Sequence, residues 1–171
     1  GVDLTGLHEI QASGGSLPRF PTLKWKLSHV KLNKIIVNAE SKPIDFVQGI
    51  PSTLFAYKDK KFVWKHYIRR LLLTGSLKER PALIDSEATL AKHYGFGYKT
   101  LIIGSRFVAE DKYIDEIITF FDNLPENTWL HFHCSHGRGR TSLLLVMLDI
   151  MKNAPKVSLK DIVKRQHLLG S

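Results

Sequence analysis

The chain has 171 residues, 43% of them hydrophobic, so it can bury a core that needs neither a disulfide nor a structural metal. Its 25 Lys and Arg against 16 Asp and Glu give a formal net charge of +9, which favours anionic partners. No nucleic-acid-binding signature is present, and the longest apolar run, residues 143–151, is far shorter than the roughly 20 residues that span a membrane. These features disfavour nucleic acid and a transmembrane segment.

Hydrophobic periodicity predicts that strands and helices alternate along the chain. Short runs rich in β-branched and aromatic residues are typical of buried strands, whereas apolar residues three or four positions apart indicate amphipathic helices. This alternation predicts an α/β fold with a central, mostly parallel or mixed sheet flanked by helices, and we expect one domain over residues 1–171. The predicted strands cover 34–38, 53–57, 98–103 and 129–133; the predicted helices cover 62–73, 87–94, 111–124, 140–152 and a last segment after Ser158.

Local signals define the ends of several helices. Ser86 is a typical N-cap, and Gly95 supplies the left-handed residue that commonly ends a helix. Pro125 stops the next helix. Ser158 and Asp161 have the spacing of a capping box, which predicts the start of the last helix.

The predicted strand 129–133 runs directly into a glycine-rich turn and then into a helix. At such a junction several backbone N–H groups and the positive end of the helix dipole face one point, where an anion binds well. Glycines allow the tight turn, and an Arg can donate two hydrogen bonds to phosphate oxygens. The sequence therefore predicts a phosphate-binding loop formed by Ser135, His136, Gly137, Arg138, Gly139 and Arg140.

Cys134, the single cysteine of the chain, begins this turn and cannot form an internal disulfide. Inward-facing amides, a helix N-terminus and cations lower a cysteine pKa from about 8.5 to roughly 3.5–7.5, so we expect a nucleophilic thiolate. Thr141 or Ser142 is placed to donate a hydrogen bond to the sulfur. His133, one residue earlier, is expected to support the loop from beneath.

Three other interpretations of the cysteine are open. A buried structural thiol would leave the two arginines of the same turn unexplained. A redox-sensing thiol lacks a second cysteine that could resolve a sulfenic acid. A metal site is the third, because nitrogen and sulfur ligands gather at His131, His133, Cys134 and His136. No second cluster with zinc-like spacing occurs, so we expect no metal and no other cofactor.

The loop and its surroundings resemble the protein tyrosine phosphatase superfamily and, within it, the PTP-like phytases, which are cysteine phosphatases that remove phosphates from inositol hexakisphosphate. The segments that carry the resemblance are 46–51, 95–98, 129–134, 152–153, 157–162, 165–167 and, more faintly, 12–16. The resemblance implies a tyrosine-phosphatase-like fold, with Cys134 as the nucleophile that forms a phosphocysteine and Arg140 as the phosphate-binding arginine.

The resemblance also implies the kind of partner and setting. Its substrates would be anionic: an inositol phosphate or another phosphorylated small molecule, a phosphoinositide headgroup, or a phosphoprotein. Family habit implies a bacterial protein that is secreted or delivered into a host as an effector. Neither the substrate nor an oligomeric state follows from the residues themselves.

Two positions depart from the family pattern. The family carries its general acid as the Asp of a Thr-Asp-His sequence, and the ungapped equivalent here is Ser105. Serine does not give up a proton at neutral pH, and loss of a general acid costs about 10² to 10⁴ in rate. The second position is Glu40, where the family usually has a substrate-binding Arg.

Three residues are candidates for the missing acid. Glu110 and Asp111 follow the same loop, although both are equally placed to cap the next helix. His136 lies two positions after the cysteine, where myotubularin-like lipid phosphatases carry an acidic residue, and histidine titrates near neutral pH. Alternatively, His136 and Arg138 only add positive charge for a phosphorylated ligand.

The sequence therefore predicts a cysteine-dependent phosphomonoester hydrolase of the phytase-like or dual-specificity-like type. Its expected catalytic residues are Cys134, Arg140 and His136. The alternative is a pseudophosphatase that binds phosphorylated ligands without efficient turnover, because the usual general-acid Asp is absent.

Overall fold

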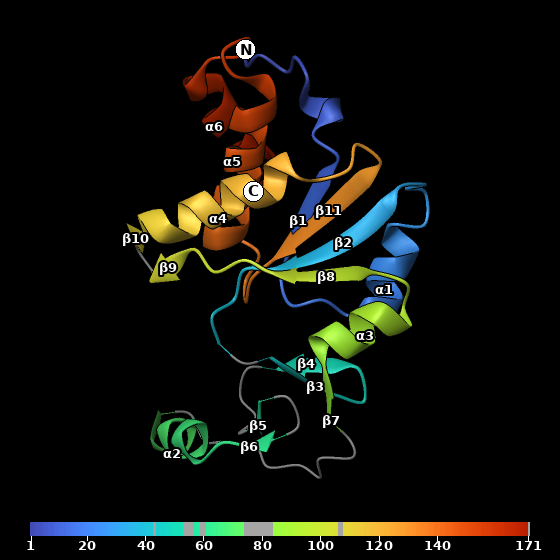
Figure 1. Ribbon diagram of the computed structural model, residues 1–171, viewed down its shortest axis with the longest axis vertical. Coiled ribbons are helices and arrows are strands. Elements are labelled where there is room, and N and C mark those ends of the chain that lie inside the picture. Colours follow the sequence, from blue (N-terminus) through green and yellow to red (C-terminus); the bar gives the residue numbers. More distant parts are fainter. Residues whose placement is uncertain (43, 53–56, 59–60, 74–83, 106–107, 171) are drawn as a thin grey trace. The chain divides into compact units, whose positions relative to one another are not determined.

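The computed structural model describes residues 1–42, 44–52, 57–58, 61–73, 84–105 and 108–170 (Figure 1). The chain forms two compact units. The first unit comprises Gly1–Ser16, Leu32–Glu40 and Lys99–Ser171, and the second comprises Leu17–Lys31 and Ser41–Tyr98. That the two units make one domain stays a prediction.

The first unit contains β1, β11, β2 and the last two residues of β8, and these strands form a four-stranded sheet with the order β1-β11-β2-β8. The strands are β1 (Ala12–Gly15), β2 (Asn33–Asn38), β8 (Gly97–Thr100) and β11 (Thr128–His133). The central strand β11 pairs in parallel with both β1 and β2, and five of its six residues are buried. Parallel strands are normally buried on both faces, which fits the burial of β11.

Helices pack against this sheet. Helices α4 (Asp111–Asp122) and α5 (Gly139–Asn153) lie against it, and α6 (Leu159–Gly170) packs against α5. The unit also contains a 3-10 turn at Leu7–Glu9 and a short hairpin of β9 (Gly104–Ser105) and β10 (Val108–Ala109). Helix α5 contacts β1, β11 and α6. The predicted α/β fold with a mostly parallel sheet and flanking helices is confirmed. The buried core of this unit consists of Ile10, Val37, Ala39, Leu101, Ile103, Ile117, Phe121, Leu130, Phe132, Cys134, Leu144 and Leu148.

The second unit contains a small antiparallel sheet with the order β4-β3-β7 and a separate two-stranded hairpin. Phe20 lies at its centre and packs against the rings of Phe46, Tyr94 and Phe96. The strands are β3 (Asp45–Val47), β4 (Ile50–Ser52), β5 (Tyr57–Lys58), β6 (Lys61–Phe62) and β7 (Ile84–Ser86), and the helices are α1 (Phe20–Lys26), α2 (Trp64–Leu73) and α3 (Glu87–His93).

The predicted helix caps are confirmed. The Ser86 hydroxyl accepts a hydrogen bond from the backbone N–H of Thr89 at 3.2 Å, and Gly95 has the left-handed φ of 83° after α3. Ser158 accepts from the backbone N–H of Asp161 at 3.2 Å, as a capping box requires.

Three element boundaries differ from the sequence prediction. Helix α2 begins at Trp64 because Phe62 belongs to β6. Strand β8 ends at Thr100, although Leu101 and Ile103 are buried; their apolar character reflects core packing and not strand pairing. The predicted strand 53–57 lies outside the described residues except for Tyr57, which is in β5.

A buried ion pair joins the two C-terminal helices. Asp149 of α5 is fully buried and pairs with Arg165 of α6, which is 1% exposed. Gln166 and Asn153 donate to the same carboxylate at 2.8 and 2.9 Å. Burial alone would raise the pKa of Asp149, but these hydrogen bonds, that from Arg165 foremost, hold the pKa below its usual 3.8. Arg165 also donates to the backbone carbonyl of Thr5 at 2.8 Å, which ties the N-terminal segment to both helices.

We expect Arg165→Ala to lower the free energy of unfolding by about 3–5 kcal/mol, because it leaves a buried carboxylate without its main partner. The Asp149 contribution is present above the unfolded pKa near 3.8 and is lost as the pH falls further, because the folded pKa lies lower. Urea unfolding at pH 7 and at pH 3 measures both effects. The control is Glu116→Gln, which breaks an exposed pair with Lys99 and should cost less than about 1 kcal/mol. Equal losses in the two variants would contradict the expectation.

Candidate phosphate-binding site

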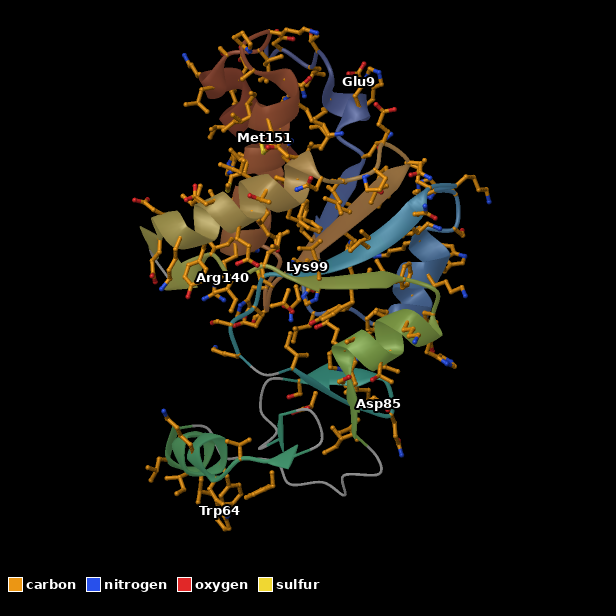
Figure 2. All side chains as sticks on the ribbon, in the orientation of Figure 1. Glu9, Trp64, Asp85, Lys99, Arg140 and Met151 are labelled. Carbon is orange, nitrogen blue, oxygen red and sulfur yellow. The ribbon has the colours of Figure 1, made fainter. Side chains whose placement is uncertain are left out.

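The predicted loop lies at the carboxyl edge of the parallel sheet. It connects β11 to α5, and the last residue of β11, His133, is in register with Gly15 of β1 and Asn38 of β2. In open α/β sheets ligands bind outside the carboxyl ends of the strands. Figure 2 labels Arg140, the second residue of α5, at this place. The fold therefore puts the loop where such sheets bind ligands.

Gly137 lies so close to the end of β1 and to Ser16, which follows β1, that no side chain fits at this position. Its φ is 72°, and a Cβ there would approach the backbone of Gly15 to 2.6 Å and that of Ser16 to 2.7 Å. Gly139 differs, because a Cβ at that position would meet nothing within 4 Å. Of the two glycines predicted to allow the turn, only Gly137 is required by packing within the protein.

The sulfur of Cys134 is surrounded by hydrogen-bond donors. The Thr141 hydroxyl lies 3.3 Å from Sγ, and the backbone N–H groups of Thr141, His136 and Gly137 also donate to it. Burial is the largest single influence and raises the pKa of Cys134, but the four donors together outweigh it. The net pKa lies below the usual value, which favours a thiolate. Of the two hydroxyl residues predicted to serve the sulfur, the structure places Thr141 there.

Glu40, which the resemblance aligns with a substrate-binding Arg of the family, lies against the loop. Its Oε1 accepts a hydrogen bond from Arg140 Nη1 at 3.1 Å, and its Oε2 accepts one from Ser135 Oγ. The Glu40 side chain is only 4% exposed, against 21% for Arg140. These contacts span 95 and 100 positions of sequence, so only the pairing of β2 with β11 could have revealed them.

The remaining loop residues differ in exposure. His133 is fully buried at the end of β11, and its carbonyl accepts from the backbone N–H of Ala39 at 2.8 Å, which secures the adjacent end of β2. The side chains of His136 and Arg138 are exposed, although the His136 amide faces the sulfur. His136 therefore contributes backbone to the base of the site and its imidazole to the solvent side.

The candidate acids outside the loop have other environments. Glu110 is the N-cap residue of α4 without a side-chain capping bond, and it forms an exposed ion pair with Lys112 at 3.0 Å. Asp111 is the first residue of α4, where an acidic side chain complements the helix dipole. Ser105 ends β9, with its backbone paired to Val108. The roles of these residues in catalysis stay predictions.

The histidines considered as metal ligands have structural surroundings. His131 Nδ1 lies 2.8 Å from Ser13 Oγ, which also accepts from Trp129 Nε1 at 3.1 Å, so this chain of bonds joins β1 to β11. Within the described ranges, no three His, Cys, Asp or Glu side chains are grouped to hold a metal ion. In the same part of the chain, every helix lacks the combination of length and hydropathy that a bilayer-spanning segment needs.

A parallel sheet with a strand–loop–helix junction, and a thiol at the start of the loop, is the arrangement that the tyrosine-phosphatase-like class is expected to have. Comparison with known structures supports this class. The tandemly repeated PTP-like phytase of Mitsuokella multacida superposes with a TM-score of 0.76 at 24% identity, over 99% of this chain and 33% of that chain. A PTP-like phytase of Bdellovibrio bacteriovorus gives a TM-score of 0.72 at 26% identity, over 94% of this chain and 67% of that chain.

Within this class, the resemblance to the PTP-like phytases is confirmed. The family model for PTP-like phytases, whose description is "Inositol hexakisphosphate", matches residues 76–152. Curated relatives match over shorter segments. The uncharacterized protein AvrBs1.1 of Xanthomonas euvesicatoria is 51% identical over 37 residues, which are 22% of this chain and 36% of that protein. The effector protein hopD2 of Pseudomonas syringae pv. tomato is 29% identical over 88 residues, which are 51% of this chain and 19% of that protein. The matches thus span about a third or less of these relatives.

We expect Thr141→Val to raise the pKa of Cys134, because it removes the hydroxyl that hydrogen-bonds the thiolate. The loss of a bond worth about 1.4 kcal/mol would move the midpoint of the alkylation rate with iodoacetamide to higher pH by about one pH unit. Ser142→Ala is the matched control, since it removes the neighbouring hydroxyl and should leave the midpoint unchanged. Equal midpoints for Thr141→Val and the unaltered protein would refute the role of this hydroxyl.

Proposed function

We propose that the chain is a cysteine-dependent phosphomonoester hydrolase. The observation that carries the proposal is the set of donors directed at Cys134, namely the Thr141 hydroxyl and the amides of His136, Gly137 and Thr141. They stabilise a thiolate at the start of a phosphate-binding loop, which is the form of cysteine that attacks phosphorus. A buried structural thiol would not need four donors.

The proposed reaction has two steps. The Cys134 sulfur attacks phosphorus, a P–S bond forms, the P–O bond to the leaving alcohol breaks, and the alcohol oxygen takes up a proton. Water then attacks the phosphocysteine, which releases inorganic phosphate and restores the thiolate. In both steps the backbone N–H groups of Ser135 to Arg140 and the Arg140 guanidinium stabilise the charge on the phosphoryl oxygens. His133 and Thr141 support the loop and the sulfur.

We propose His136 as the group that protonates the leaving oxygen. A leaving group departs roughly in line with the attacking atom, so its oxygen lies on the side of the phosphate away from the buried sulfur. The exposed imidazole of His136 belongs to the same loop and is on the solvent side, and histidine exchanges protons near neutral pH. Glu110 is less suitable, because its carboxylate is paired with Lys112.

The proposed substrates are phosphate monoesters on anionic molecules, with inositol phosphates first. Support comes from the family match over residues 76–152 and from a PTP-like myo-inositol phosphatase of Mitsuokella multacida whose structure holds myo-inositol-(1,3,4,5)-tetrakisphosphate, with a TM-score of 0.77. Phosphoinositide headgroups and phosphoproteins remain alternatives. The partial match to an effector protein supports delivery into a host.

A pseudophosphatase is the second candidate function. The observation that favours it is the serine at position 105, where the family has its general acid. Such a protein would bind phosphorylated ligands in the loop and release little phosphate.

Turnover is tested with Cys134→Ser, which should abolish phosphate release from an aryl phosphate and from inositol hexakisphosphate, because oxygen at this position is a poor nucleophile. Release is measured as inorganic phosphate, and binding of inorganic phosphate is measured by calorimetry for both proteins. Absence of Cys134-dependent release from either substrate, with phosphate still bound, would reject the hydrolase and leave the pseudophosphatase.

The role of His136 is tested with His136→Ala on two leaving groups. If the imidazole supplies the proton, kcat should fall by about 10² to 10⁴ with an alkyl phosphate, whereas an aryl phosphate, whose leaving oxygen needs less help, should lose at least about tenfold less. Arg138→Gln removes an exposed cation of the same loop and should affect both substrates alike. If His136→Ala lowers kcat equally for both substrates, the imidazole contributes only positive charge and does not supply the proton.

A further inference from the structure

The carboxylate of Glu40 is built into the base of the phosphate loop. Glu40 follows β2, and its backbone N–H donates to Asn38 Oδ1 at 2.8 Å. This hydrogen bond holds the backbone of Glu40, from which the side chain extends. Its two oxygens then accept from two different loop residues, Ser135 and Arg140. A side chain only 4% exposed and held at both oxygens occupies a set position.

This arrangement makes Glu40 an acceptor and not a proton donor. Both oxygens face N–H or O–H donors, so neither is directed at a leaving group. Among the described residues, Arg140 makes this one hydrogen bond through Nη1, which leaves Nε and Nη2 for a phosphate. The carboxylate therefore orients the guanidinium and also cancels its formal charge.

Burial decides which charges a ligand experiences most. His136 and Arg138 are exposed, so water and salt screen their charges, whereas a buried charge is screened much less. At the base of the loop the Glu40 carboxylate opposes Arg140, and the attraction for one phosphate rests on the backbone amides and the helix dipole. Those act over a short range. Because Glu40 cancels the charge of Arg140, further phosphates of a ligand, which lie beyond the reach of the amides, gain no net attraction from this arginine.

We propose that Glu40 is a specificity-determining residue that favours ligands with one isolated phosphate monoester over ligands with phosphates on adjacent carbons. The inference rests on the proposed function, because it takes the loop as the phosphate site. Among the proposed substrates, the inference favours those with a single phosphate near the loop. The amides bind that phosphate, and Glu40 lowers the affinity for further phosphates on adjacent carbons.

The test compares two ligands in the Cys134→Ser protein, so that binding is measured without turnover. Calorimetry gives Kd for phenyl phosphate and for inositol hexakisphosphate, with and without Glu40→Gln. The amide keeps the size of the side chain and one acceptor oxygen but removes the charge. Glu40→Gln should tighten hexakisphosphate binding about tenfold more than phenyl phosphate binding, on the scale of a charge interaction across a partly buried site.

The control is Glu116→Gln, which makes the same change of net charge at an exposed position of α4 and should leave the ratio of the two Kd values unchanged. If Glu40→Gln leaves the ratio of the two Kd values unchanged, or weakens binding of both ligands equally, the inference is wrong. Binding of phenyl phosphate in that case would still support the loop as a phosphate site. If a folded Cys134→Ser protein binds neither ligand, the proposed function fails and the inference falls with it.

Discussion

The close approach of the loop to β1 is the constraint on which the rest of the site depends. A Cβ on Gly137 would lie 2.6 Å from the backbone of Gly15, and a Cβ on Gly14 would lie 2.7 Å from the methyl group of Thr141. The loop and α5 can therefore approach the first strand only because both glycines lack side chains. This approach brings Thr141 close enough for its hydroxyl to reach both Cys134 Sγ and the carbonyl of Gly15.

Two groups with lowered pKa values lie near the two ends of α5, namely Cys134 in the loop before the helix and Asp149 near its carboxyl end, and they have different environments. At Cys134 and at Asp149, burial raises the pKa and hydrogen bonds outweigh it. Asp149 is shielded from water and bonded to a cation, so its charge supports structure alone. Cys134 is held mainly by amides and a hydroxyl, without a cation on the sulfur among the described contacts. A thiolate held in this way, without a cation on the sulfur, fits the proposed role as a nucleophile.

The sequence was sufficient to predict what depends on neighbouring residues. The loop from Cys134 to Thr141, the amphipathic helices and the Ser86 and Ser158 caps all follow from contiguous patterns, and the structure has them. Strand β1 was missed, because Ala12 to Gly15 has low β-propensity and forms a strand only through its pairing with β11. The resemblance placed Glu40 at a substrate-binding position, but its hydrogen bonds to the loop were missed for a similar reason. Its contacts arise from the register of β2 beside β11, which no local pattern encodes.

The phosphate loop and the position of the family's usual acid lie in different parts of the chain. The groups proposed to bind the phosphate come from residues 134–141, and Glu40 accepts hydrogen bonds from two of these residues. All of them lie in one unit whose core is continuous with the sheet. The family's acid belongs to a separate loop, so its replacement by Ser105 leaves the phosphate-binding groups in place. Loss of an acid costs about 10² to 10⁴ in rate, but this cost falls on leaving groups that need a proton. The basicity of the leaving oxygen, and not recognition of the phosphate, therefore decides how fast such a site turns over.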